Sequence, residues 1–81
     1  SEEKSSVLSR STSLLDMHLE EIVEESEEIR ALVSALKVMA PHDKKRDDYE
    51  ARLCVALTHL DHHVKPAIKE WDRVLDKMPD G

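Results

Sequence analysis

The chain has 81 residues, a formal net charge of −6 and one cysteine, so it forms one small domain and no disulfide within the chain. Its apolar residues are mostly aliphatic, with no Phe, one Tyr and one Trp, and its one glycine is the last residue. Sheets need turns rich in Gly and Asn, which this chain lacks, so the composition predicts an all-α fold. The acidic charge balance argues against nucleic acid and anionic membrane as binding partners.

The sequence also indicates where the protein resides. No apolar run approaches the ~20 residues that a membrane span needs. Residues 1–10 lack the basic and apolar regions of a signal peptide, and a lone cysteine suits a reducing compartment. We therefore expect a soluble cytoplasmic or nuclear protein, or a fragment of one, that uses no cofactor.

A first long helix is predicted after a polar N-terminal segment over residues 1–12, which can itself be partly helical because no Gly or Pro interrupts it. "STS" at 11–13 offers N-caps, and Ser13 with Asp16 has a capping-box spacing. The helix should end at Ala40, because Pro41 disfavours helical geometry in the residue before it. Steps of four and three define its apolar core series, in which Ser26 is the break: Leu15, Leu19, Ile22, Ser26, Ile29, Val33, Leu36 and Ala40.

A second long helix is predicted after the polar connection "PHDKKRD". Asp47 and Glu50 have a capping-box spacing at its start. Pro66 lacks an N–H and clashes with the preceding turn, so it should kink this helix. A full break there, giving a three-helix bundle, is the alternative. The apolar series of this helix is Tyr49, Leu53, Leu57, Leu60, Val64, Ile68, Trp71, Leu75 and Met78.

Two long helices joined by a short connection must lie antiparallel, so residues 13–81 are predicted to form one helical-hairpin domain. The apolar faces are wider than a two-helix seam, since Val23, Leu32, Val55 and Ala67 flank the core series. A hairpin alone leaves these flanks exposed. We therefore expect further helices to cover them, from a second copy in a homodimeric four-helix bundle or otherwise from a heterologous helical protein.

The histidines pose a separate question, because three of the five lie within residues 59–63. His59 and His63 share one helix face, and the register inferred from the loop places His63 level with Glu24. Three interpretations follow: a solvated patch facing glutamates, a buried polar layer of Ser26 and His63 that fixes register, or a metal site of His59 and His63 with a glutamate. His18 is expected to lie too far along the helix to take part.

The function predicted from these patterns is non-enzymatic protein–protein interaction or oligomerisation through helix packing, as in a small adaptor, regulator or chaperone-like subunit. No residue set predicts catalysis, and Cys54 is expected to be a buried structural thiol. A metal-binding bundle using His59 and His63 is the alternative. A third possibility is a nucleic-acid mimic, since residues 16–28 carry seven acids and no Lys or Arg. The residues expected to supply the packing are Leu15, Leu19, Ile22, Ile29, Leu32, Leu36, Leu53, Leu60 and Trp71.

Overall fold

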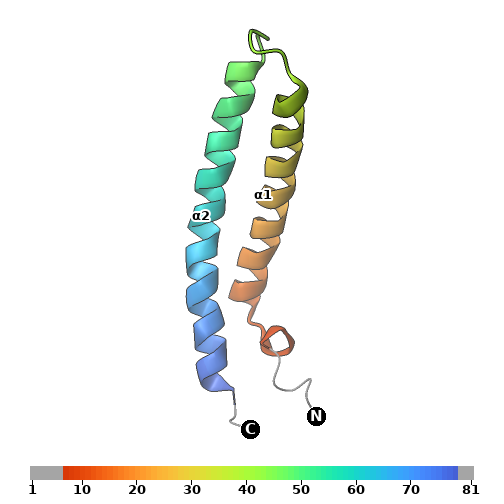
Figure 1. Ribbon diagram of the computed structural model, residues 1–81. Coiled ribbons are helices and arrows are strands. Elements are labelled where there is room, and N and C mark those ends of the chain that lie inside the picture. Colours follow the sequence, from red (N-terminus) through yellow and green to blue (C-terminus); the bar gives the residue numbers. More distant parts are fainter. Residues whose placement is uncertain (1–6, 79–81) are drawn as a thin grey trace.

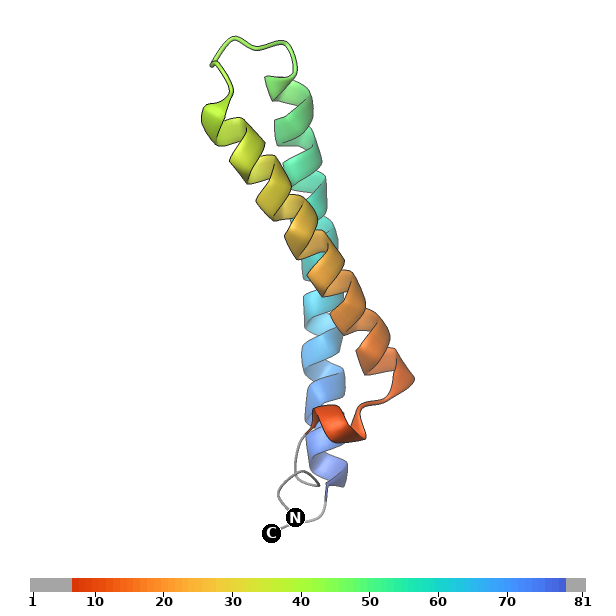
Figure 2. The same cartoon turned by 90° about the vertical axis from the view of Figure 1, so that its right-hand side faces the viewer.

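The protein is a two-helix antiparallel hairpin in the computed structural model, which describes residues 7–78. A short 3-10 helix, η2 (Leu8–Arg10), precedes α1 (Ser13–Val38), and a loop leads to α2 (Arg46–Lys77). Figure 1 shows α1 and α2 side by side, and Figure 2 shows that they cross at an angle. The chain measures 58 × 21 × 16 Å. The predicted all-α hairpin is confirmed, and neither described helix is long and apolar enough to cross a membrane.

The start of α1 is fixed by Thr12, not by the predicted Ser13. The Thr12 backbone is extended, and its hydroxyl accepts a hydrogen bond from the Leu15 N–H at 3.1 Å, which satisfies one of the free N–H groups of the first turn. The same hydroxyl donates to the carboxylate of Glu70 on α2 at 2.8 Å. Glu70 is 6% exposed and also accepts from Arg73 at 3.2 Å. The cap of α1 is therefore tied directly to α2.

Both helices meet the loop earlier in the sequence than predicted. Because Met39 is already extended, α1 ends at Val38, two residues before Ala40. Its last carbonyls are satisfied from α2, since the Arg46 guanidinium donates to the carbonyls of Leu36 and Met39 at 3.4 Å each. The capping box predicted at Asp47 does not form: α2 begins one residue earlier, at Arg46, with Lys45 as N-cap and no side-chain cap bond.

Pro66 lies inside α2 without interrupting it, so the alternative of three separate helices is wrong. Its missing N–H removes the helical partner of the His62 carbonyl. His62 itself is exposed. Figure 1 shows α2 as a continuous, gently curved ribbon.

The core is small and lies mainly in the half of the hairpin near the termini. Its buried residues are Val7, Leu15, Ala67 and Val74, with Leu19, Ile22 and Met78 packed against them. Val7 belongs to the segment predicted over residues 1–12, of which residues 1–6 lie outside the described part of the chain. Toward the loop, Leu32 and Ala56 are buried. The small side chains of Ala56 and Ala67 face the seam, which allows the helices to approach closely.

The residues predicted to supply packing are buried to different degrees. Leu15 is fully buried and Leu32 is 5% exposed, whereas Trp71 is 37% exposed. The others are half-buried: Leu19, Ile22, Ile29, Leu36, Leu53 and Leu60. Cys54 is exposed, which corrects the expectation of a buried thiol, because it lies on α2 away from the seam with α1.

Candidate functional site

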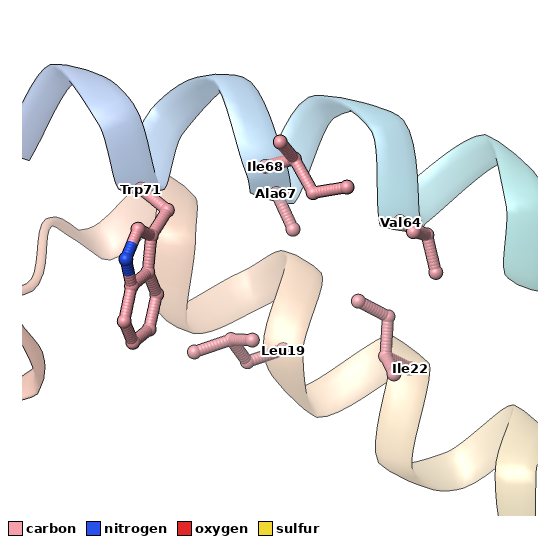
Figure 3. Close-up of a pocket in the computed structure, with 6 residues that line it drawn as sticks. All are labelled: Leu19, Ile22, Val64, Ala67, Ile68 and Trp71. Carbon is pink, nitrogen blue, oxygen red and sulfur yellow. The ribbon is translucent and has the colours of Figure 1, made fainter.

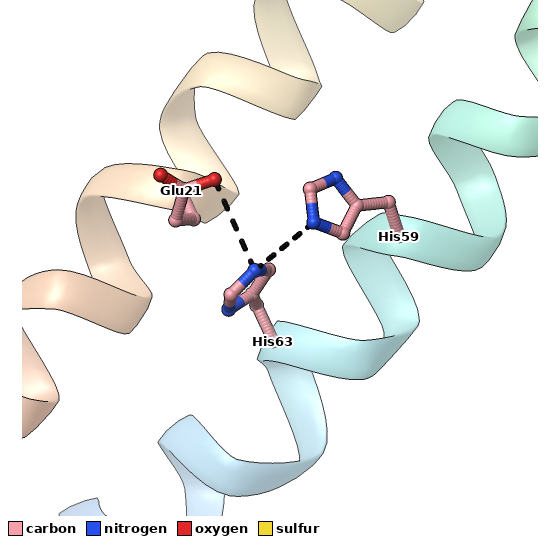
Figure 4. Close-up of side chains that lie close together, drawn as sticks. All are labelled: Glu21, His59 and His63. Atoms are coloured by element: carbon pink, nitrogen blue, oxygen red, sulfur yellow. Dashed lines mark hydrogen bonds and ion pairs between the residues drawn. The ribbon is translucent and has the colours of Figure 1, made fainter.

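A histidine–glutamate cluster lies between the helices near the middle of the hairpin. On α2, His59 and His63 are one turn apart and project from the same face. On α1, His18, Glu21 and Glu25 are spaced by three and four residues, so they also share a face. Figure 4 shows Glu21 directed from α1 toward the two imidazole rings of α2.

His63 is the centre of this cluster, because both of its ring nitrogens have partners. Its Nδ1 lies 2.9 Å from Nδ1 of His18, and its Nε2 lies 3.3 Å from Nε2 of His59. The same Nε2 is 3.9 Å from a carboxylate oxygen of Glu21. At the outer end, His59 Nδ1 is 2.7 Å from a carboxylate oxygen of Glu25. The five side chains thus form one connected network across the seam.

The expectation that His18 lies out of reach is wrong, and the helix ends explain why. α1 ends two residues earlier than predicted and α2 begins one residue earlier, so the register moves by three residues. This shift brings Glu21, not Glu24, level with His63. His18 is one turn further along the same face of α1 and reaches the other nitrogen of His63. Glu25, the residue after Glu24, contacts His59.

The predicted pairing of Ser26 with His63 is not seen. Ser26 is exposed, and among the described residues the partners of the His63 ring are His18, His59 and Glu21. The polar group packed into the seam beside His63 is instead His18, which is only 9% exposed. His62 and the remaining acids of residues 16–28 stay outside this network.

The hydrogen bonds of the cluster indicate which ring nitrogen of His59 carries the proton. A carboxylate only accepts, so the contact with Glu25 requires that His59 Nδ1 carry a proton. In a neutral ring His59 Nε2 is then the acceptor, so its 3.3 Å contact with His63 Nε2 is a hydrogen bond that His63 donates. A histidine whose Nδ1 donates to a carboxylate keeps its Nε2 lone pair for another partner, and this arrangement supports metal ligation.

An apolar groove is the second feature, and it lies on the other flank of the seam. It has a volume of about 340 Å³ and is lined by Leu19, Ile22, Val64, Ala67, Ile68 and Trp71. Figure 3 shows these side chains facing one another from the two helices, with the Trp71 indole extending toward α1. Ile68 at the rim is 57% exposed. The groove can therefore accept an apolar side chain from outside.

The groove continues along α2 as an exposed apolar stripe. Its members are spaced by seven, four, three and four residues, which places them on one helix face. Four of the five are large apolar residues that are exposed in the described chain, with exposed fractions from 37% to 57%. The stripe, as the name is used below, consists of Leu57, Val64, Ile68, Trp71 and Leu75.

Sequence reasoning identified His59, His63 and Trp71 but not His18 or Glu21. The three-residue spacing of His18 and Glu21 was a usable signal, but only together with the correct register. No protein-family model, curated protein or solved structure matches this chain.

Proposed function

We propose that this protein is a non-enzymatic self-association module, in which two hairpins pack through their grooves and stripes to make a four-helix bundle. The observation that carries the proposal is the groove itself: an apolar hollow of about 340 Å³ beside projecting apolar side chains. A contiguous apolar surface of this kind marks an interaction site in soluble proteins.

The amount of exposed surface supports a second chain. The hairpin exposes 6194 Å² for a mass of 9.3 kDa, whereas a compact monomer of that mass exposes about 5,000 Å². The excess, roughly 1,200 Å², exceeds the ~800 Å² that each partner buries in a standard interface. The radius of gyration of 17.6 Å agrees, because a compact chain of this length has about 12 Å. A second hairpin packed on the groove would cover surface of this amount.

A second copy suits this surface better than an unrelated occupant, because the patch carries both parts of an interlocking contact. A two-fold interface requires that one patch be complementary to itself. Here Ile68 and Trp71 project at the rim of the hollow that Leu19 and Ala67 help to form. Two copies related by a two-fold axis near Ile68 would place these side chains of each hairpin into the groove of the other.

The test is the mass of the protein in solution, by light scattering on a sizing column over a roughly hundredfold concentration range, because self-association obeys mass action. We expect a dimer for the wild-type chain and a helical monomer for Ile68→Glu, in which a charge would be buried without a partner. Val55→Glu is the matched control: Val55 is also an exposed aliphatic residue of α2, at 68%, but lies outside the groove and stripe.

The outcomes separate clearly. A dimer that Ile68→Glu dissociates and Val55→Glu preserves supports the proposal. A wild-type monomer throughout the concentration range overturns it and would favour a heterologous helix as occupant of the groove. A dimer that Ile68→Glu leaves intact overturns the assignment of the interface. Circular dichroism of each variant verifies that the helices persist.

A further inference from the structure

We propose that Glu21, His59 and His63 form a binding site for one zinc ion between α1 and α2, with Glu25 and His18 positioning the two histidines. One ligand atom from each of Glu21, His59 and His63 lies within 4.8 Å of the other two. Two imidazoles and one carboxylate are an established zinc ligand set, in which water completes the tetrahedron. The site is independent of the self-association proposed above.

The spacing of the donor atoms matches the size of the ion. Zinc–nitrogen bonds of about 2.0–2.1 Å at tetrahedral angles place two ligand atoms roughly 3.3 Å apart. The Nε2 atoms of His59 and His63 are 3.3 Å apart. The Glu21 oxygen is 3.9 Å from His63 Nε2 and within 4.8 Å of the His59 ligand atom. Movement of the Glu21 side chain by roughly 0.5–1.5 Å would therefore bring all three atoms to the spacing of a tetrahedral site. Figure 4 shows the three groups converging from the two helices.

The outer partners hold the donors in the required state. Glu25 accepts the Nδ1 proton of His59 at 2.7 Å, which leaves the Nε2 lone pair of His59 facing the site. His63 Nε2 is free for a metal when the proton of that ring is on Nδ1, where His18 Nδ1 can accept it at 2.9 Å. Besides the movement of Glu21, binding requires that the ring proton of His63 be on Nδ1 and that of His18 on Nε2.

Access to the site is also suitable. The His59 side chain is 47% exposed and that of Glu21 is 36% exposed, so an ion can enter from solvent and keep a water as fourth ligand. His63 is more enclosed, with its side chain 17% exposed, and sits between the helices. Because the ligands come from both helices, the ion would link α1 to α2 and stabilise the folded hairpin.

The experiment is calorimetric titration of the full chain with ZnCl₂ after treatment with a chelator, together with thermal melts. We expect one zinc per chain and, at about a hundredfold excess over Kd, a rise in Tm of roughly 10 °C. Glu21→Gln and His63→Ala should each weaken binding more than tenfold. Glu25→Ala should keep the stoichiometry and weaken binding by about 10–100-fold, as loss of an outer partner does.

Matched variants control for unspecific effects. Glu24→Gln changes an exposed carboxylate of α1 outside the cluster, and His62→Ala changes the histidine next to His63. Both should bind zinc as the wild-type chain does. Glu21→Gln alters a half-buried side chain and preserves its size, so it tests the site even if His63→Ala fails to fold. The proposal is overturned if zinc does not bind, or if His62→Ala or Glu24→Gln weakens binding as much as the ligand variants.

Discussion

The hydroxyl of Thr12 performs two tasks, so removing it should destabilise the hairpin more than losing an ordinary helix cap. It caps α1 through the Leu15 N–H at 3.1 Å and donates to the buried carboxylate of Glu70 at 2.8 Å. Thr12→Val keeps the shape of the side chain and removes both bonds. Losing the cap costs about 1 kcal/mol, and losing a hydrogen bond to a charged group about 1.5–3 kcal/mol.

The free energy of unfolding should therefore fall by about 2.5–4 kcal/mol. This is a large part of the roughly 4–12 kcal/mol typical for a chain of this length. The assay is urea denaturation followed by circular dichroism, at one fixed protein concentration so that any self-association contributes equally. Thr12→Ser, which retains the hydroxyl, is the matched control and should stay close to wild type. A Thr12→Val variant within about 0.5 kcal/mol of wild type would refute the reasoning.

Three further outcomes follow from the packing. Leu15→Ala, at a fully buried position, should lower the free energy of unfolding by about 2.7–5 kcal/mol; a smaller change in urea denaturation would mean that the core collapses around the gap. Pro66→Ala should raise the free energy of unfolding by up to about 3 kcal/mol, because α2 is continuous there and alanine restores an N–H donor; an unchanged melting curve would contradict this. The exposed Cys54 thiol should react with a thiol reagent in the native state, and reaction only after urea is added would show that it is buried.

The helices were predictable from sequence, whereas their ends were not. Apolar residues in steps of three and four over more than twenty positions determine helix type regardless of local detail. The ends depend on competition between neighbouring polar groups. Ser13 and Thr12 can both cap a helix, and the contact with Glu70 on the distant α2 favours Thr12. At the other end, Arg46 reaches across the loop to the α1 carbonyls, which no local pattern indicates.

The error of one or two residues in the predicted helix ends decides which residues of the histidine–glutamate cluster can be predicted from sequence. His59 and His63 belong to one helix, so their spacing alone brings them together. Glu21 and His18 belong to the other helix, where three residues of register decide which side chains meet. A helix presents different side chains to its neighbour at each turn. An error of three residues in the register therefore predicts the wrong contacting residues on α1, not the right residues at a longer distance. The same three residues of register explain why the sequence alone places His18 out of reach.

The two proposed sites lie on opposite sides of α2, which makes them separable by experiment. His59 and Ile68 are nine residues apart, about two and a half helical turns, so they project in opposite directions. A second hairpin packed on Ile68 would leave the exposed edge of the histidine cluster open to solvent. Ile68→Glu should therefore abolish dimerisation but retain zinc binding, and Glu21→Gln should weaken zinc binding more than tenfold but retain the dimer. Loss of dimerisation in Glu21→Gln would mean that the metal organises the interface, with the ion bridging the helices before the second copy can dock. Loss of zinc binding in Ile68→Glu would mean the reverse, that the dimer organises the metal site.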